Sequence, residues 1–236
     1  TSDKSYRNLE IQRGYKENDL IGGDDPYSGS KGAAELIIKS YFKSFISLKK
    51  NMSLNIARAG NVIGGGDWSR DRVIPDCVKS WSKNKSVQIR NPNSTRPWQH
   101  VLDVVRGYLQ SAILCKKYKK RLNGEAFNFG PNLNQNKSVI QLVKKMKNHW
   151  RKVSWKIKKE NSKKKESQLL KLNSLKSKKF LKWEPLLNFD DSVKLTALWY
   201  KSFYKKEIKS FDLSASQLAL YDRKLKKHFK NRKINI

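Results

Sequence analysis

The sequence predicts an α/β fold with a parallel sheet, because short strand-like runs alternate with segments of helical periodicity. The run at 53–60 is a short strand candidate that ends in small residues, and the run at 124–131 is a strand candidate that ends in a Gly-Pro turn. Apolar residues at helical spacing follow at 71–84 and again from Asp103 to about Tyr118. With 37% hydrophobic residues, the chain of 236 residues has enough apolar mass for a sizeable core.

The remaining elements follow from local composition. Residues 1–29 contain glycine, proline and several Asp and Asn residues, which predicts a loop-rich start. From Ser30 to about Leu48 apolar residues cover much of a helix surface, so we predict a largely buried helix. The other expected elements are a glycine-rich loop at 60–68, a strand near 86–90, a helix from Ser138, an edge strand at 153–157, helices at 175–181 and 193–203, and a loose terminal helix from Lys209.

The net charge of +32 raises the question of a nucleic-acid partner. Few of the 52 basic residues are arginines, the lysines are scattered along the chain, and no nucleic-acid-binding motif occurs. We therefore favour a lysine-rich composition bias with weak attraction to anions, and we predict no specific nucleic-acid partner. The lysine-rich stretch at 158–167 is of low complexity, and we expect it to be a disordered linker.

Other classes of site and location are disfavoured by the composition. There is no run of 18 apolar residues and no export signal, so we expect a cytoplasmic protein that does not enter a membrane. Cys77 and Cys115 are isolated thiols in apolar contexts, which is typical of core residues in a reducing compartment. The three histidines lack ligand spacing, so we expect no metal site.

One segment combines residue types that can carry out proton transfer. In PYSGSKGAAEL (26–36), Tyr27 and Lys31 are four residues apart and share one face of a helix. A lysine ammonium beside a phenol stabilises the phenolate, which makes the tyrosine a usable base. This spacing also arises by chance on helix surfaces, so the pair alone is weak support for an active site.

The pair does not stand alone, because TSDKSY (1–6) precedes it and RAGNVIGGGDW (58–68) and RNPNSTRPWQHV (90–101) follow it. In this order the chain resembles the extended short-chain dehydrogenase/reductase family, the nucleotide-sugar epimerases and dehydratases, over roughly residues 1–205. The resemblance implies NAD as cofactor and dehydration of CDP-glucose to CDP-4-keto-6-deoxyglucose, a step in nucleotide-sugar supply for surface polysaccharide. It also implies the C-terminal half of a Rossmann-type parallel sheet with helices, plus a smaller α/β substrate-binding domain.

The resemblance also implies catalytic roles. Tyr27 would accept the proton of the sugar C4 hydroxyl, and Lys31 would lower its pKa and bind the nicotinamide ribose. Ser2 would hydrogen-bond the C4 oxygen, Asp3 would protonate the departing C6 hydroxyl, and Lys4 would be the C5 base. The division of roles between Asp3 and Lys4 stays open, because an acid needs a raised pKa and a neighbouring ammonium lowers it.

Substrate-binding residues are implied in the same way. Asn61 would hold the hexose or its phosphate, and Asn91 would help to recognise the cytosine. Arg72, Arg90 and Arg96 suit the pyrophosphate and the nucleotide, because planar guanidinium groups match anionic oxygens. For any single arginine, a solvated surface charge is an equally good interpretation.

The expected domains alternate along the chain. Residues 1–62 and 98–131 would form the remaining part of a Rossmann NAD-binding domain, and 63–97 and 132–208 a nucleotide-sugar domain. Residues 209–236 would be a basic tail. The resemblance also implies a homodimer that uses the helix carrying Tyr27 and Lys31.

No Gly-x-x-Gly-x-x-Gly loop occurs in residues 1–236, although the resemblance implies one upstream of TSDKSY. We therefore expect an N-terminally truncated fragment that is inactive by itself and holds its first residues weakly. Two alternatives remain, another nucleotide-sugar epimerase or dehydratase and a non-catalytic remnant that binds a nucleotide sugar.

Overall fold

The computed structural model describes residues 1–150, 152–157 and 169–232, and the predicted linker at 158–167 lies outside these residues. The first half contains η1 (Asp3–Ser5), α1 (Pro26–Tyr41), η2 (Phe42–Ile46), β1 (Ile56–Ala59), β2 (Val62–Ile63), α2 (Val73–Trp81), β3 (Val87–Ile89), β4 (Thr95–Arg96), β5 (Gln99–His100) and α3 (Val101–Lys117). The second half contains α4 (Lys119–Leu122), β6 (Ala126–Phe129), η3 (Leu133–Gln135), β7 (Lys137–Ser138), α5 (Val139–Lys147), β8 (Trp155–Ile157), α6 (Leu175–Leu181), α7 (Phe189–Lys205) and α8 (Ser210–Arg232).

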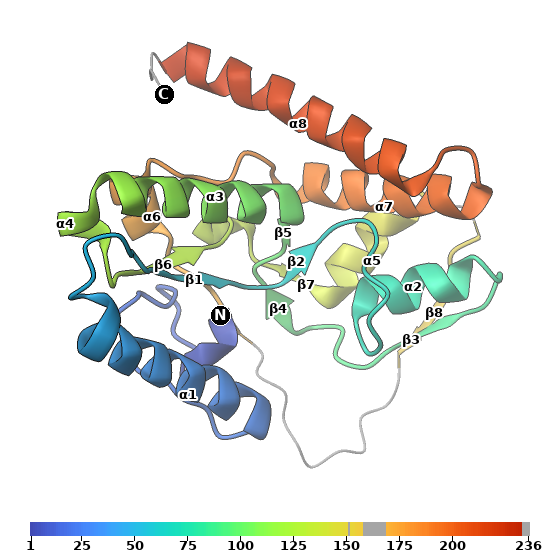
Figure 1. Cartoon of the computed structure of the whole chain (residues 1–236). Helices are drawn as coiled ribbons and strands as arrows, with labels where there is room; N and C mark the ends of the chain where they lie inside the picture. Colours follow the sequence, from blue (N-terminus) through green and yellow to red (C-terminus); the bar gives the residue numbers. More distant parts are fainter. Residues whose placement is uncertain (151, 158–168, 233–236) are drawn as a thin grey trace.

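The strands β1 and β6 form the parallel pair at the centre of one half of the molecule. Their register runs from Ile56 opposite Ala126 to Ala59 opposite Phe129. Helix α3 covers one face of this pair and α1 the other (Figure 1), which is the layering of a parallel α/β sheet. Ser2 forms a parallel bridge with Ala59, so the chain start lies beside β1. The predicted α/β class is therefore confirmed.

The other half is built from small strand pairs and helices. The β2–β5 and β3–β8 pairs are parallel, whereas β4 and β7 are antiparallel. Helices α2, α5 and α7 bury a shared core that includes Trp81, Met146 and Tyr200. Ser138 caps α5 in a capping box with Gln141, as its place before a periodic apolar run predicts.

The polar tail forms the long helix α8, which lies along α7 (Figure 1). Leu213 and Tyr221 are buried against the rest of the chain. The Tyr221 hydroxyl donates to Asp103 Oδ1 at 2.6 Å and accepts from Arg106 Nε at 2.7 Å. The expected loose helix is therefore held through a buried hydrogen-bond network.

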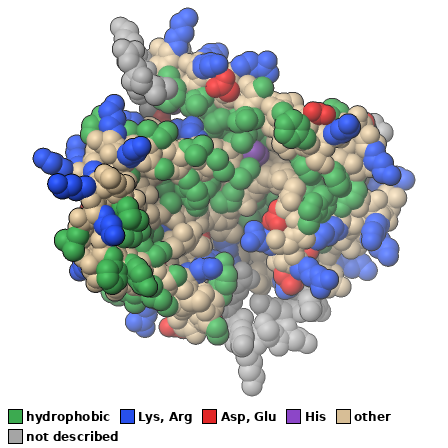
Figure 2. Space-filling view, in the orientation of Figure 1, with side chains coloured by type: hydrophobic (Ala, Val, Ile, Leu, Met, Phe, Trp, Pro, Cys, Tyr) green, Lys and Arg blue, Asp and Glu red, His purple; other side chains and the backbone are tan. Residues whose placement is uncertain are grey.

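The prediction of a largely buried helix at 30–48 is wrong. Helix α1 starts earlier, at Pro26, and its Leu36 and Ile37 side chains are both 59% exposed. Gly32 and Glu35 are the buried residues of this helix, so much of its apolar surface stays exposed in the described part of the chain. Figure 2 shows hydrophobic side chains gathered at the lower left, over the end of α1.

Two further sequence expectations can be compared with the structure. Cys77 and Cys115 are buried free thiols, as predicted. No helix in the described ranges is both long and apolar enough to cross a membrane.

Candidate active site

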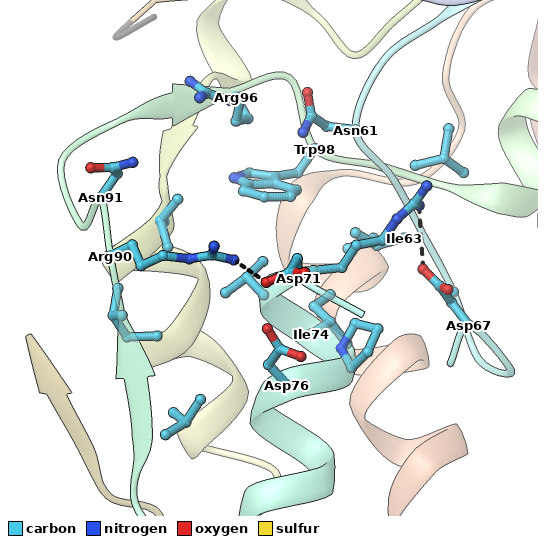
Figure 3. A pocket seen from close by; sticks show the side chains of 18 of the residues that line it. Asn61, Ile63, Asp67, Asp71, Ile74, Asp76, Arg90, Asn91, Arg96 and Trp98 are labelled. Atoms are coloured by element: carbon cyan, nitrogen blue, oxygen red, sulfur yellow. Dashed lines mark hydrogen bonds and ion pairs between the residues drawn. The ribbon is translucent and has the colours of Figure 1, made fainter. Parts of the chain in front are cut away.

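A cavity of about 640 Å³ lies between the half of the molecule that contains β1 and β6 and the half that is built from small strand pairs and helices. Every predicted site residue except Lys31 lines it. Its wall is drawn from η1, the start of α1, the loop after β1, the start of α2 and the stretch around β3 and β4. Residues as far apart in the sequence as Ser2 and Tyr200 therefore face one space. Figure 3 shows part of this wall.

The Ser2–Lys4 triplet is firmly held at one end of the cavity, so the expectation of weak anchoring is wrong. The Ser2 hydroxyl donates to Asp3 Oδ1 at 3.0 Å and accepts from the Lys4 backbone N–H at 3.2 Å. Asp3 is 2% exposed, and its Oδ2 has no hydrogen-bond partner among the described residues. A Cβ at Gly60 would lie 2.2 Å from this oxygen, so glycine is what allows the carboxyl group its place.

Burial raises the pKa of the Asp3 carboxyl above its ordinary value. Lys4, the Ser2 hydroxyl and Arg96 act in the opposite direction, but burial is the larger effect. The buried carboxyl therefore keeps its proton to higher pH, which is the direction of shift that a general acid requires.

The raised pKa predicts how Asp3 affects stability. The folded state binds the proton more tightly than the unfolded state, so wild-type stability is fully present below the ordinary pKa and falls as pH rises through the folded pKa. We expect Asp3→Asn to raise the melting temperature at pH 7, by about 2–4 °C per kcal/mol, with the difference from wild type shrinking as the pH falls below 4. Thermal unfolding between pH 3.5 and 7 measures this difference.

Asp19 provides a control, because its pKa is shifted in the opposite direction from that of Asp3. A hydrogen bond from Arg13 lowers the pKa of Asp19, so the stability it contributes is present at neutral pH and is lost on acidification. Asp19→Asn should therefore destabilise at pH 7 and have little effect at low pH. A melting temperature for Asp3→Asn that stays below wild type at pH 7 would contradict the assignment.

Tyr27 and Lys31 lie at the start of α1. Asp25 caps the helix, and its Oδ1 accepts hydrogen bonds from the backbone N–H groups of Tyr27 and Ser28, both at 3.0 Å. Tyr27 is 56% exposed on the cavity wall, and Lys31 Nζ lies 5.2 Å from the centre of its ring. The predicted pair is therefore together in space, with Lys31 beside the phenol.

Sequence reasoning missed the buried ion pair that supports this end of the site. Arg58 is 0% exposed, and its Nε donates to Glu35 Oε1 at 2.7 Å while its Nη2 donates to Glu35 Oε2. Its Nη1 donates to the Tyr6 hydroxyl at 2.6 Å. These bonds tie β1 to α1 and to the residues after η1, so they fix Tyr27 relative to Ser2. The sequence signal for this ion pair was Arg58, which lies between two alanines in the strand β1.

Two of the predicted anion-binding arginines already contact carboxylates. Arg72 Nη1 lies 3.3 Å from Asp67 Oδ2, and Arg90 Nη2 lies 3.0 Å from Asp71 Oδ1 (Figure 3). Arg96, in contrast, is buried, and its Nη1 donates to the Thr95 carbonyl at 2.8 Å. The acidic partners were not anticipated from the sequence.

The two predicted asparagines lie on the same wall. Asn61 adopts a left-handed conformation with φ of 43°, and its side-chain oxygen has no hydrogen-bond partner within the described part of the chain. Asn91 follows β3 beside Arg90 (Figure 3). The Trp98 ring, which the sequence analysis did not single out, lies between Asn61 and the Arg90–Asp71 pair in this view.

No histidine is among the described residues that line this wall. His100 is buried, its Nδ1 accepts from the Leu102 N–H at 3.3 Å to cap α3, and burial lowers its pKa to about 4. Within the described ranges no group of three or more His, Cys, Asp or Glu side chains could hold a metal ion. His100 is therefore a neutral structural residue.

The parallel pair with helices on both faces is a Rossmann-type α/β fold, and solved structures share it. UDP-glucuronic acid 4-epimerase from Bacillus cereus, in complex with UDP-glucuronic acid and NAD, superposes with a TM-score of 0.71 at 19% identity. It covers 86% of this chain, which covers 60% of that structure. dTDP-glucose 4,6-dehydratase from Bacillus anthracis, in complex with NAD, has a TM-score of 0.67 at 21% identity. It also covers 86% of this chain, which covers 60% of that structure.

Residues 2–196 match the family described as GDP-mannose 4,6 dehydratase, and the chain belongs to this family. It is 40% identical over 213 residues to CDP-glucose 4,6-dehydratase of Salmonella typhimurium, covering 88% of this chain and 58% of the relative. It is 27% identical over 183 residues to human dTDP-D-glucose 4,6-dehydratase, covering 75% of this chain and 48% of the relative. The chain thus spans about half the length of these curated relatives.

Proposed function

We propose that the chain carries the sugar-binding and proton-transfer part of an NAD-dependent CDP-glucose 4,6-dehydratase. The observation that carries the proposal is the single cavity, where Ser2, Asp3, Lys4 and Tyr27 share a wall with the three predicted arginines. The 40% identity to a CDP-glucose 4,6-dehydratase supports CDP-glucose over other nucleotide sugars. The product is CDP-4-keto-6-deoxyglucose, and the buried free thiols fit work in the cytoplasm.

The residues present fit one end of NAD. Tyr27 lies half-exposed on the cavity wall with Lys31 beside its ring, where a nicotinamide ribose could be bound. The chemistry that NAD supplies when bound is removal of hydride from sugar C4 and its return at C6. The Gly-x-x-Gly-x-x-Gly loop that would bind the pyrophosphate of NAD does not occur in residues 1–236.

The chain's own residues handle the protons. The Tyr27 hydroxyl accepts the proton of the C4 hydroxyl, and the adjacent Lys31 ammonium favours the resulting phenolate. The Ser2 hydroxyl, held by Asp3 and the Lys4 N–H, orients the C4 oxygen. Asp3 delivers a proton to the leaving C6 hydroxyl, because burial keeps the carboxyl protonated to higher pH. Lys4 takes the C5 proton.

The arginines bind the diphosphate. A substrate diphosphate would replace Asp67 and Asp71 as the partner of Arg72 and Arg90, since guanidinium groups pair with either anion. Arg96 lies near enough to Asp3 to affect its ionisation, so it belongs to the sugar-phosphate end of the cavity.

We further propose that two copies associate through α1. The exposed side chains of Leu36, Ile37 and Tyr41 form an apolar surface on this helix, and such a surface is stabilised when another apolar face covers it.

The test uses the chain joined to the part of the Salmonella relative that the match does not cover. With NAD present, we expect a 4-keto product from CDP-glucose and much less from dTDP-glucose or GDP-mannose. Chromatography and the absorbance of the 4-keto sugar in alkali measure it. Product from GDP-mannose in preference to CDP-glucose would overturn the substrate, and no product from any nucleotide sugar would overturn the reaction.

A further inference from the structure

Asp76 is a cavity-lining carboxylate for which the proposed reaction has no use. It lies in α2, on the cavity wall, and no hydrogen bond or ion pair joins its side chain to any other described residue. In Figure 3 its carboxylate points from α2 toward the Arg90–Asp71 pair. The carboxylate is partly buried on the cavity wall, so it can accept a hydrogen bond from a ligand that enters the cavity.

Asp76 lies at the opposite end of the cavity from the reacting groups. A second hollow of about 450 Å³ adjoins this end. It shares no residue around Ser2 and Tyr27 with the cavity, but it shares Asp71, Asp76, Val87, Gln88 and Arg90. The charges that act on Asp76 are those of Asp71, Arg90 and Lys79, whereas Arg96 acts on Asp3. The cavity therefore runs from the Ser2–Tyr27 end to the Asp76 end.

If the chain has the proposed function, the direction of the cavity gives each part of the nucleotide sugar its position. With the hexose at Ser2 and Tyr27 and the diphosphate at the arginines, the nucleoside falls at the Asp76 end. Cytosine carries an exocyclic amino group where uracil carries a carbonyl oxygen. A carboxylate accepts hydrogen bonds only, so it attracts the amino group and repels the carbonyl.

We propose that Asp76 determines base specificity by accepting a hydrogen bond from the exocyclic amino group of cytosine. Its neighbour Asp71 is a poorer candidate because it already pairs with Arg90 and its side chain is 78% exposed. Burial and the nearby Asp71 raise the pKa of Asp76, so the ionised form gains from any donor that reaches it.

The test is calorimetric titration of the purified chain with CDP, UDP and GDP, which requires no catalytic activity. We expect the wild type to bind CDP more tightly than UDP. In Asp76→Asn the ratio of the two affinities should fall by roughly tenfold or more, the size of one charge-assisted hydrogen bond. The asparagine amide can also donate to the uracil carbonyl, which lowers the ratio further.

Asp71→Asn is the matched control, because it removes the same charge at the same end of the cavity. It frees Arg90 for the diphosphate, so CDP and UDP affinities should change together and their ratio should stay within about twofold. If Asp76→Asn is poorly folded by circular dichroism, Asp76→Ala removes the acceptor altogether, so the CDP-to-UDP ratio is again expected to fall by roughly tenfold.

Each contrary outcome has a distinct meaning. An unchanged CDP-to-UDP ratio in a folded Asp76 variant overturns the role of Asp76 and leaves the proposed function intact. Tighter binding of GDP than CDP that is lost in Asp76→Asn assigns the carboxylate to guanine and overturns the cytosine proposal. A wild-type chain that binds none of the three nucleotides overturns the proposed function itself.

Discussion

Replacing Tyr27 with phenylalanine is expected to reduce formation of the 4-keto sugar by roughly 10²–10⁴-fold, the contribution of a positioned general base. The substitution removes one oxygen at the cavity wall and leaves the arginines untouched. CDP-glucose affinity should therefore change by no more than about twofold. Turnover of the joined protein described above and calorimetric affinity measure the two quantities separately.

The reason for so large an effect lies in the local structure. Asp25 caps α1 and fixes the first turn, and Lys31 lies over the Tyr27 ring, so the phenol is both oriented and close to a positive charge. No other tyrosine lines the wall near Ser2; Tyr200 is the one other phenol of this cavity among the described residues, and its hydroxyl donates to the Asp67 carbonyl.

Tyr41→Phe is the matched control, since Tyr41 ends the same helix with similar exposure but lies off the cavity. It should leave turnover within about twofold of wild type. Full turnover in Tyr27→Phe, or an equal loss in Tyr41→Phe, would contradict the assignment of Tyr27 as the base.

The second large effect is expected from Arg58→Met. The substitution leaves the Glu35 carboxylate buried without its guanidinium partner, which costs about 3–5 kcal/mol of unfolding free energy. Burial by itself raises the pKa of Glu35, but hydrogen bonds from Arg58 and Thr1 outweigh it and hold the pKa below its ordinary value. The pair's contribution is therefore present at neutral pH and is lost as pH falls through the folded pKa. Urea unfolding at pH 7 measures the loss.

Two comparisons sharpen this prediction. Arg13→Met breaks a pair with Asp19 in which Arg13 is 47% exposed, and exposed pairs contribute about 0.2–1 kcal/mol. Adding Glu35→Leu to Arg58→Met removes the stranded charge, so much of the lost stability should return. A single Arg58→Met variant no less stable than Arg13→Met would disprove the structural role of the buried pair.

Local sequence patterns were sufficient to predict much of the structure of this protein. Helical spacing located α6 at 175–181, and the glycines around 60–68 marked the loop that borders the cavity. The Tyr27–Lys31 spacing marked a candidate base and the family resemblance pointed to Arg96, and Tyr27 and Arg96 both line the cavity. These features depend on neighbours in the chain, where periodicity and turn chemistry act directly.

The partners of those residues depend on contacts between distant segments. Asp103 and Tyr221 are 118 positions apart, and only the docking of α8 brings their oxygens within 2.6 Å. The same holds for the burial that raises the pKa of Asp3 and for the pairing of Arg58 with Glu35. Periodicity also overestimated the burial of α1, because it reports which faces are apolar and says nothing about whether another element covers them.

The sequence by itself determined the α/β class, the order of the elements and the chemical groups of the site. The tertiary structure alone decided which of these groups face one another, how deeply each is buried, and that the Asp76 carboxylate lines the cavity without a donor among the described residues. The physical reason is that a side chain's chemistry is local, whereas its solvation and its partners are set by the topology that packs remote segments together.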